Sequence, residues 1–163
     1  MIIIFYLIFS FFFDSISTNY LNYELTNISY FKTIYTIISL VIVYEYYRHK
    51  SKYFITLIVI SFLFDIRYTN TFVLNPVIFS LIYLLNIILD NHLPNNILTI
   101  NIKTITSINI YHLLTYIILI ISNYNNYQIT SLFTIIIRSI PMTIIYTTIS
   151  YLTLKKISPK LIK

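Results

Sequence analysis

Residues 61–85 read SFLFDIRYTNTFVLNPVIFSLIYLL, and this stretch determines the fold that the sequence predicts. Its first apolar segment stops at Asp65 and Arg67, and a second apolar segment begins at Asn75-Pro76 after a short polar passage. Two apolar segments so close together indicate two membrane helices joined by a tight turn. Proline is favoured in the first turn of a helix, so Asn75-Pro76 predicts the start of the second helix.

The composition of the whole chain places it among membrane proteins. Of its 163 residues, 58% are hydrophobic and 10% are charged, whereas a soluble domain has about 25% charged residues. A soluble fold of this size would lack the polar surface needed to cover its core. The formal charge of +6 lies in short clusters between apolar segments. It therefore indicates membrane topology and the lipid bilayer as partner, and not nucleic acid.

The residue types that are absent also restrict the fold and its chemistry. The chain has no Gly, no Ala and no Cys. Membrane helices pack closely through small residues, so Ser and Thr are predicted to be packing residues here. Without Gly there is no Gly-rich phosphate loop and no Gly-x-Ser-x-Gly turn. We predict no enzymatic activity, no catalytic residue, no cofactor and no metal site, although aspartyl chemistry from Asp14 and Asp65 is conceivable.

The apolar segments predict an all-α integral membrane protein, a single transmembrane domain over residues 1–163 that forms a six-helix transmembrane bundle. The predicted spans are approximately residues 1–20, 28–47, 53–69, 72–89, 105–121 and 129–154. The first segment has no basic region before it and no small-residue cleavage site, so it is expected to be a retained helix. Asp90 to Lys103 is predicted to be a polar loop.

Positive charge orients the six predicted spans. With residues 48–52 in the cytoplasm, both termini are cytoplasmic, and the inner side has eight Lys or Arg residues against two outside. The inner eight are Arg48, Lys50, Lys52, Lys103, Lys155, Lys156, Lys160 and Lys163. Lys32 and Arg67 lie outside, and Arg138 is within the last span. This asymmetry is typical of a multi-pass protein of the plasma membrane.

Three charged residues are predicted to lie inside the membrane at a similar depth. At about 1.5 Å per residue, Asp14 and Asp65 lie about 20 Å from the cytoplasmic start of their helices, and Arg138 lies about 13 Å from the outer side. An unpaired charge at that depth costs at least about 2.5 kcal/mol. Two interpretations remain open: a buried ion pair between these residues, or acids at helix ends with an arginine that reaches the surface.

The remaining ionisable residues are expected to have simpler roles. Glu45 is predicted to pair with Arg48 at the interface, while His49 and His92 are expected to be solvated. His112 is predicted to be packed and hydrogen-bonded within its span. The candidate cluster for structure or partner binding therefore consists of Asp14, Asp65, Arg67, Asn75 and Arg138.

Several of these motifs together resemble the family of the rod shape-determining protein MreD. Asp65 ends the third span and Leu74-Asn75-Pro76 opens the next, while a first helix ends in Phe-Phe-Asp14-Ser15. The last span carries Arg138-Ser-Ile-Pro141 before a basic tail. The glycines that the family commonly has around the aspartate are replaced here, with Ser61 and Val73 near those positions.

The resemblance implies a non-enzymatic membrane component of the bacterial cell-elongation complex, which regulates cell shape and lateral peptidoglycan synthesis. It implies an MreC-like bitopic membrane protein as partner and, through it, the actin-like MreB filament and peptidoglycan synthases. The alternative is a substrate-binding membrane subunit of a small-molecule (vitamin) transporter, because such subunits are also small six-span bundles. A small membrane enzyme is a third and less favoured class.

Overall fold

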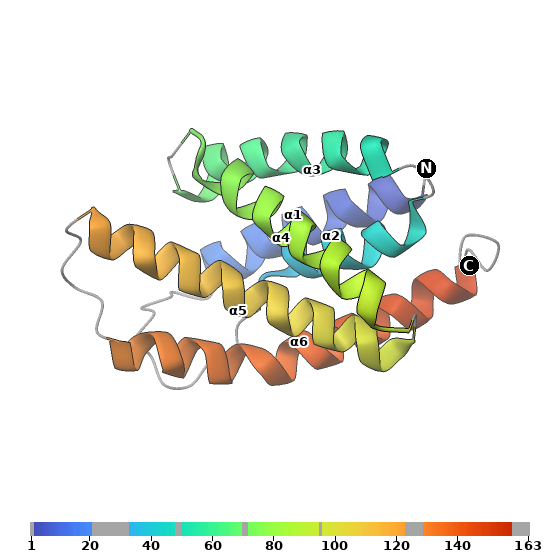
Figure 1. The fold of residues 1–163 in the computed structure, drawn as a ribbon. Helices are drawn as coiled ribbons and strands as arrows, with labels where there is room; N and C mark the ends of the chain where they lie inside the picture. Colours follow the sequence, from blue (N-terminus) through green and yellow to red (C-terminus); the bar gives the residue numbers. More distant parts are fainter. Residues whose placement is uncertain are drawn as a thin grey trace.

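The computed structural model describes residues 2–20, 33–47, 50–69, 72–94, 96–122 and 129–157. In these ranges the chain is all-helical, as predicted, with six α-helices and one π-helical turn (Figure 1). The elements are α1 (Ile2–Tyr20), α2 (Tyr35–Tyr46), α3 (Lys50–Phe64), η1 (Asp65–Thr69), α4 (Leu74–His92), α5 (Ile97–Ile121) and α6 (Ile129–Ile157).

Three of the described helices, α4, α5 and α6, are long and apolar enough to cross a membrane, which makes the chain a membrane protein. The helices α1 and α2 contain shorter apolar stretches. Helix α2 has 12 residues and is therefore about 18 Å long. That length is well short of the roughly 30 Å of hydrocarbon in a bilayer. The residues at its start, from Thr33 to Thr36, are buried, so α2 begins inside the bundle.

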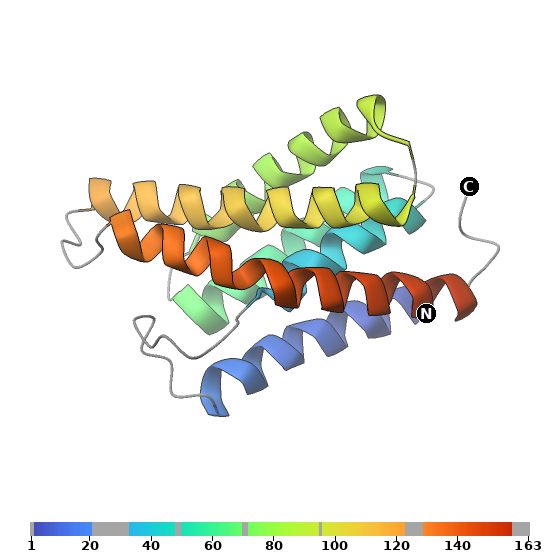
Figure 2. The ribbon, with the colours of Figure 1, turned by 90° about the horizontal axis from the view of Figure 1, so that it is seen from below.

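Helix α2 is the centre around which the other helices are arranged (Figures 1 and 2). It contacts α1, α5, α6 and α3, and each of its residues except Glu45 is buried. Tyr53 from α3 donates a hydrogen bond to the Leu40 carbonyl in the middle of α2, at 3.0 Å. A helix that is apolar on every side is stable only when it is enclosed in this way.

Ser and Thr side chains form the close helix contacts, as the missing Gly and Ala predict. The buried face of α6 places Ser139, Thr143 and Thr147 at four-residue spacing. The Thr143 hydroxyl lies 2.7 Å from the Thr33 hydroxyl beside α2, and Thr147 donates to Thr104 of α5 at 3.1 Å. These residues therefore combine a small volume with a hydrogen bond between helices.

The structure corrects one predicted connection and shortens one predicted helix. The predicted polar loop from Asp90 to Lys103 is wrong, because α4 continues to His92 and α5 begins at Ile97. The connection ends at Asn96, whose side chain accepts the Thr99 N–H at 2.8 Å and caps α5. Of the predicted span 28–47, residues 28–32 lie outside the described ranges, and the helix itself begins only at residue 35.

Other boundaries agree with the sequence more closely. Helix α4 begins at Leu74, so the predicted helix start at Asn75-Pro76 is confirmed. The predicted span 53–69 begins three residues earlier as α3 and ends in the π-helical turn η1. His92 is exposed, as expected, although it lies in the last turn of α4 and not in a loop.

The start of α1 and the end of α6 lie at the same end of the bundle (Figures 1 and 2). The start of α3, the end of α4 and the start of α5 are at this end as well, and the end of α3 and the start of α4 are at the other (Figure 1). Lys50 and Lys52 at the start of α3 and Lys155 and Lys156 at the end of α6 therefore gather at one end. The positive-inside rule predicts that this end is cytoplasmic.

A topology reporter tests this orientation. A reporter that is active only in the cytoplasm should work when fused after Lys163 or inserted near Lys50, because Lys50 and the end of α6 lie at the basic end (Figure 1). It should be inactive when inserted between Ser122 and Gln128. Reporter activity at that last position would contradict the six-span arrangement.

Candidate functional site

The first candidate residue, Asp14, holds the N-terminus of the central helix. Its carboxylate is 4% exposed and accepts the backbone N–H groups of Tyr35 at 3.0 Å and Thr36 at 2.7 Å. The Thr36 hydroxyl donates to the same carboxylate at 2.6 Å. The residue at the N-cap position of α2, Ile34, has no side chain that can accept these bonds. An aspartate from α1 therefore replaces the missing cap of α2.

The second candidate residue, Asp65, does the same for α4. Its carboxylate is fully buried and accepts the Asn75 backbone N–H at 3.1 Å. The Asn75 side-chain amide donates to it as well, at 2.7 Å. The N-cap residue of α4 is Val73, which makes no side-chain cap. The two candidate residues Asp65 and Asn75 are thus in direct contact, on either side of the α3–α4 connection.

The same physical reason explains both caps. The first N–H groups of a helix have no partner within the helix, and inside a membrane no water can satisfy them. The N-terminal end of a helix also carries a partial positive charge that favours a carboxylate. A buried aspartate and a buried helix N-terminus each carry a large penalty alone, and together they offset it. The sequence predicted intramembrane acids at these positions but not these partners.

Arg67 connects the π-helical turn η1 to α1. Its guanidinium is exposed and donates to the Ser15 hydroxyl, with Nη2 at 3.2 Å. The neighbouring Tyr68 donates its hydroxyl proton to the Phe11 carbonyl at 2.9 Å, and the two rings pack edge to face. π-Helical turns are frequent at functional sites. This one brings a cation beside the residue that follows Asp14.

Arg138, the last candidate, lies half-buried on α6. The next residue, Ser139, belongs to the buried face of α6. On that face Thr143 contacts Thr33, just before the start of α2. Its pairing with Asp14 or Asp65 stays a prediction. His112 is half-buried on α5, within the bundle.

A second polar centre, at the opposite end of the bundle, was missed by the sequence analysis. The Lys103 side chain is 0% exposed, and its ammonium group donates to Glu45 of α2 at 2.6 Å. It also contacts the Asp90 carboxylate of α4. The Lys50 ammonium of α3 lies 3.9 Å from Asp90 and 3.2 Å from the centre of the Tyr44 ring. Four helices therefore meet in one ion network with two acids and two lysines.

The predicted loop explains why this network was missed. With residues 90–103 assigned to a long loop, Asp90 and Lys103 appeared to be solvated. The connection is a short turn between two antiparallel helices, so acids and bases on its two sides face each other. Asn96, three residues before Thr99, was the local signal for an early start of α5. Arg48, the predicted partner of Glu45, lies outside the described residues, and the structure pairs Glu45 with Lys103.

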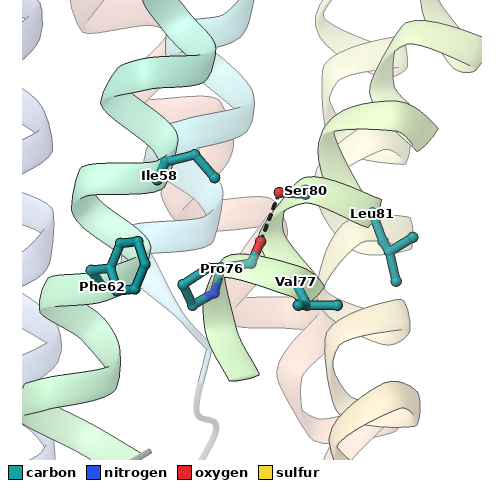
Figure 3. A pocket seen from close by; sticks show the side chains of 6 residues that line it. All are labelled: Ile58, Phe62, Pro76, Val77, Ser80 and Leu81. Carbon is teal, nitrogen blue, oxygen red and sulfur yellow. Dashed lines mark hydrogen bonds between the residues drawn. The ribbon is translucent and has the colours of Figure 1, made fainter. Parts of the chain in front are cut away.

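An apolar groove of about 350 Å³ lies between α3 and α4 (Figure 3). Ile58 and Phe62 of α3 form one wall, and α4 contributes Pro76, Val77, Ser80 and Leu81. The Ser80 hydroxyl donates to the Pro76 carbonyl at 2.7 Å, so the polar group is already bonded. Ser80 is the small residue of this groove, of the kind that permits close approach of another helix.

Two further findings bear on chemistry and ancestry. Among the described residues, no group of three or more His, Asp or Glu side chains is placed to hold a metal ion. No protein-family model, curated protein or solved structure matches this chain.

The Asp65 cap can be tested by a double-mutant cycle. Asp65→Asn should lower the free energy of unfolding by about 1–2 kcal/mol, because the bonds then go to a neutral amide oxygen and not to a charged carboxylate. Combined with Asn75→Ala, the loss should be smaller than the sum, since Asn75→Ala removes the donor of a bond that Asp65→Asn weakens. Unfolding in detergent, followed by circular dichroism, measures each value.

Two comparisons sharpen this test. Asn96→Ala removes an ordinary cap that is exposed at the α4–α5 turn and should cost about 1 kcal/mol or less. Asp65→Asn combined with Arg138→Gln tests the predicted ion pair in the same assay. Additive losses in both cycles would refute the assignment of Asp65 as a buried, partnered carboxylate.

The ion network around Lys103 yields a larger expected effect. Lys103→Met removes the cation between two partly exposed carboxylates, Glu45 at 11% and Asp90 at 24%. Breaking a fully buried pair costs about 3–5 kcal/mol, and the loss here should be smaller because Asp90 keeps Lys50 nearby. Adding Glu45→Gln and Asp90→Asn should restore much of the lost stability, because no unpaired charge then remains. Lys52→Met, at an exposed position on α3, should change the unfolding free energy by less than about 0.5 kcal/mol. If the triple variant is as unstable as Lys103→Met alone, charge pairing is not what stabilises this network.

Proposed function

We propose that this chain is a non-enzymatic membrane component of the bacterial cell-elongation complex. In this role it regulates cell shape and lateral peptidoglycan synthesis through protein–protein contacts in the plasma membrane. The proposed topology is a bundle of six spans with both termini in the cytoplasm. Its partners are an MreC-like bitopic membrane protein and, through it, actin-like MreB and peptidoglycan synthases.

The observation that supports this proposal is the bond between Asp65 and Asn75. It lies in the stretch that resembles the MreD family, and it ties the end of α3 to the start of α4. The Asp65 carboxylate therefore has a structural partner within its own chain, as does Asp14 at the start of α2. Such use of intramembrane acids favours a rigid scaffold, because their charge is directed at the protein's own backbone.

A scaffold needs a surface for its partner, and the groove between α3 and α4 is suited to one. Its lining is mostly apolar, and α4 contributes the small residue Ser80 to it (Figure 3). A transmembrane helix of a bitopic protein can approach such a residue closely. The rigid Asp65–Asn75 connection fixes the relative position of the two helices that form the groove.

One observation favours the alternative, a substrate-binding membrane subunit of a vitamin transporter. Transporters often bind anionic substrates at the N-terminus of a helix that begins inside the membrane, and the N-terminus of α2 is buried within the bundle. In this chain the Asp14 carboxylate already occupies that N-terminus. The position that would bind a substrate anion is therefore taken by the protein itself, and the scaffold is the better supported role.

Co-purification tests the proposed partner. The detergent-solubilised chain should retain an MreC-like bitopic protein and show no hydrolytic turnover. Val77→Trp fills the groove and should reduce the retained partner severalfold. Ile145→Trp is the matched control, because Val77 is 53% exposed and Ile145, on the face of α6, is 54% exposed.

The outcomes separate the two proposed roles. Equal retention by both variants would place the contact outside the groove. Failure to retain the bitopic protein, together with high-affinity retention of a vitamin, would replace the proposal with the transporter role.

A further inference from the structure

We infer that the basic end of the bundle binds the phosphate headgroups of anionic phospholipids through Lys52, Lys155 and Lys156. Lys52 lies near the start of α3, and the other two lie in the last turn of α6. All three residues are exposed, and both helix ends lie at the same end of the molecule (Figures 1 and 2). We call these three residues the basic rim.

The first argument concerns the acids of the chain, which are used elsewhere. Asp14 and Asp65 cap helices, and Glu45 and Asp90 surround Lys103. The fifth acid, residue 24, lies outside the described ranges, and residues 91–163 contain no acid at all. Within the described part of the chain, no carboxylate forms a salt bridge with the basic rim. Its counter-ions must therefore come from the surroundings.

The second argument concerns depth in the membrane. Helix α6 has 29 residues and is about 43 Å long, whereas the hydrocarbon core is about 30 Å thick. Measured from Ile129, the predicted entry point, Tyr151 lies about 33 Å along the helix and Lys155 about 39 Å. Bilayers measure about 40–45 Å with their headgroups. Each headgroup layer is therefore about 5–8 Å thick, and the Lys155 backbone lies about 9 Å beyond the inner edge of the core. The long lysine side chains of α6 can reach the phosphates from that level.

The third argument is the local chemistry of the α6 end. Tyr151 is buried just before the lysines, and the Lys155 ammonium lies 6.0 Å from the centre of its ring. The exposed apolar residues Leu152 and Ile157 flank the pair. Apolar, aromatic and basic side chains in this order are typical of a helix that passes through the interface. A juxtamembrane cation there gains attraction from anionic lipid.

These lysines also face the negative end of the α6 dipole. That role is independent of the lipid, whereas headgroup binding depends on lipid charge. A comparison between anionic and zwitterionic lipids therefore distinguishes the two.

The experiment uses the full chain purified in detergent and exposed to equal amounts of phosphatidylglycerol and phosphatidylcholine. The ratio of the two lipids that remain bound is measured by native mass spectrometry. The wild-type protein should prefer phosphatidylglycerol, and the preference should weaken at high salt. Each Lys→Gln substitution in the basic rim should reduce the preference up to about fivefold, which corresponds to about 1 kcal/mol per lysine.

Two variants serve as controls. Lys155→Arg with Lys156→Arg keeps the charge and should keep the preference. Arg67→Gln removes one positive charge at the opposite end, where the guanidinium bonds Ser15, and should leave the ratio unchanged. Equal retention of the two lipids by the wild type would overturn the inference. So would a loss in Arg67→Gln as large as that in the lysine variants.

Discussion

The structure depends on one constraint: a helix whose first turn is buried in the protein must have a partner for its first N–H groups. Helices α2 and α4 both begin after an apolar N-cap residue, Ile34 or Val73. In each case an aspartate from an earlier helical segment, Asp14 within α1 or Asp65 at the start of η1, accepts the free N–H groups. The same device therefore occurs twice in the chain, as α1–Asp14–α2 and as α3–Asp65–α4. Because α2 is the enclosed centre of the bundle, the packing of α1, α5 and α6 follows from where Asp14 holds it.

The composition imposes a second constraint on how closely the helices approach. A membrane bundle normally relies on Gly and Ala at its contacts, and this chain has neither. Ser139, Thr143 and Thr147 take that role on α6. Each hydroxyl must find an acceptor away from water, so these contacts are hydrogen-bonded as well as close. Thr143 meets Thr33, and Thr147 meets Thr104. The polar residues within the apolar segments therefore belong to the packing of the core.

The sequence predicted the helical class and the position of the α3–α4 connection, because both depend on local signals. Apolar length identified the helices, and Asn75-Pro76 marked the start of α4. The sequence did not predict the partners of Asp14, because the carboxylate and the Thr36 N–H are 22 residues apart and meet only in the fold. It also missed the Lys103 network, because one wrong loop assignment hid the facing acids. Contacts between distant residues follow from packing, which apolar periodicity alone does not determine.

The allocation of charge determines where function can lie on this molecule. Four of its five acids lie in the described ranges, and each is bound to a backbone N–H, a hydroxyl or a buried lysine. Reacting with or binding an external ligand at these carboxylates would break bonds that position the helices. Two surfaces remain available: the apolar groove between α3 and α4, and the lysines at the start of α3 and the end of α6. The groove can contact another protein within the bilayer, and the lysines can contact the anionic surface of the bilayer. The described acids thus hold the helices together, while the exposed lysines at one end and the groove between α3 and α4 stay open for contact.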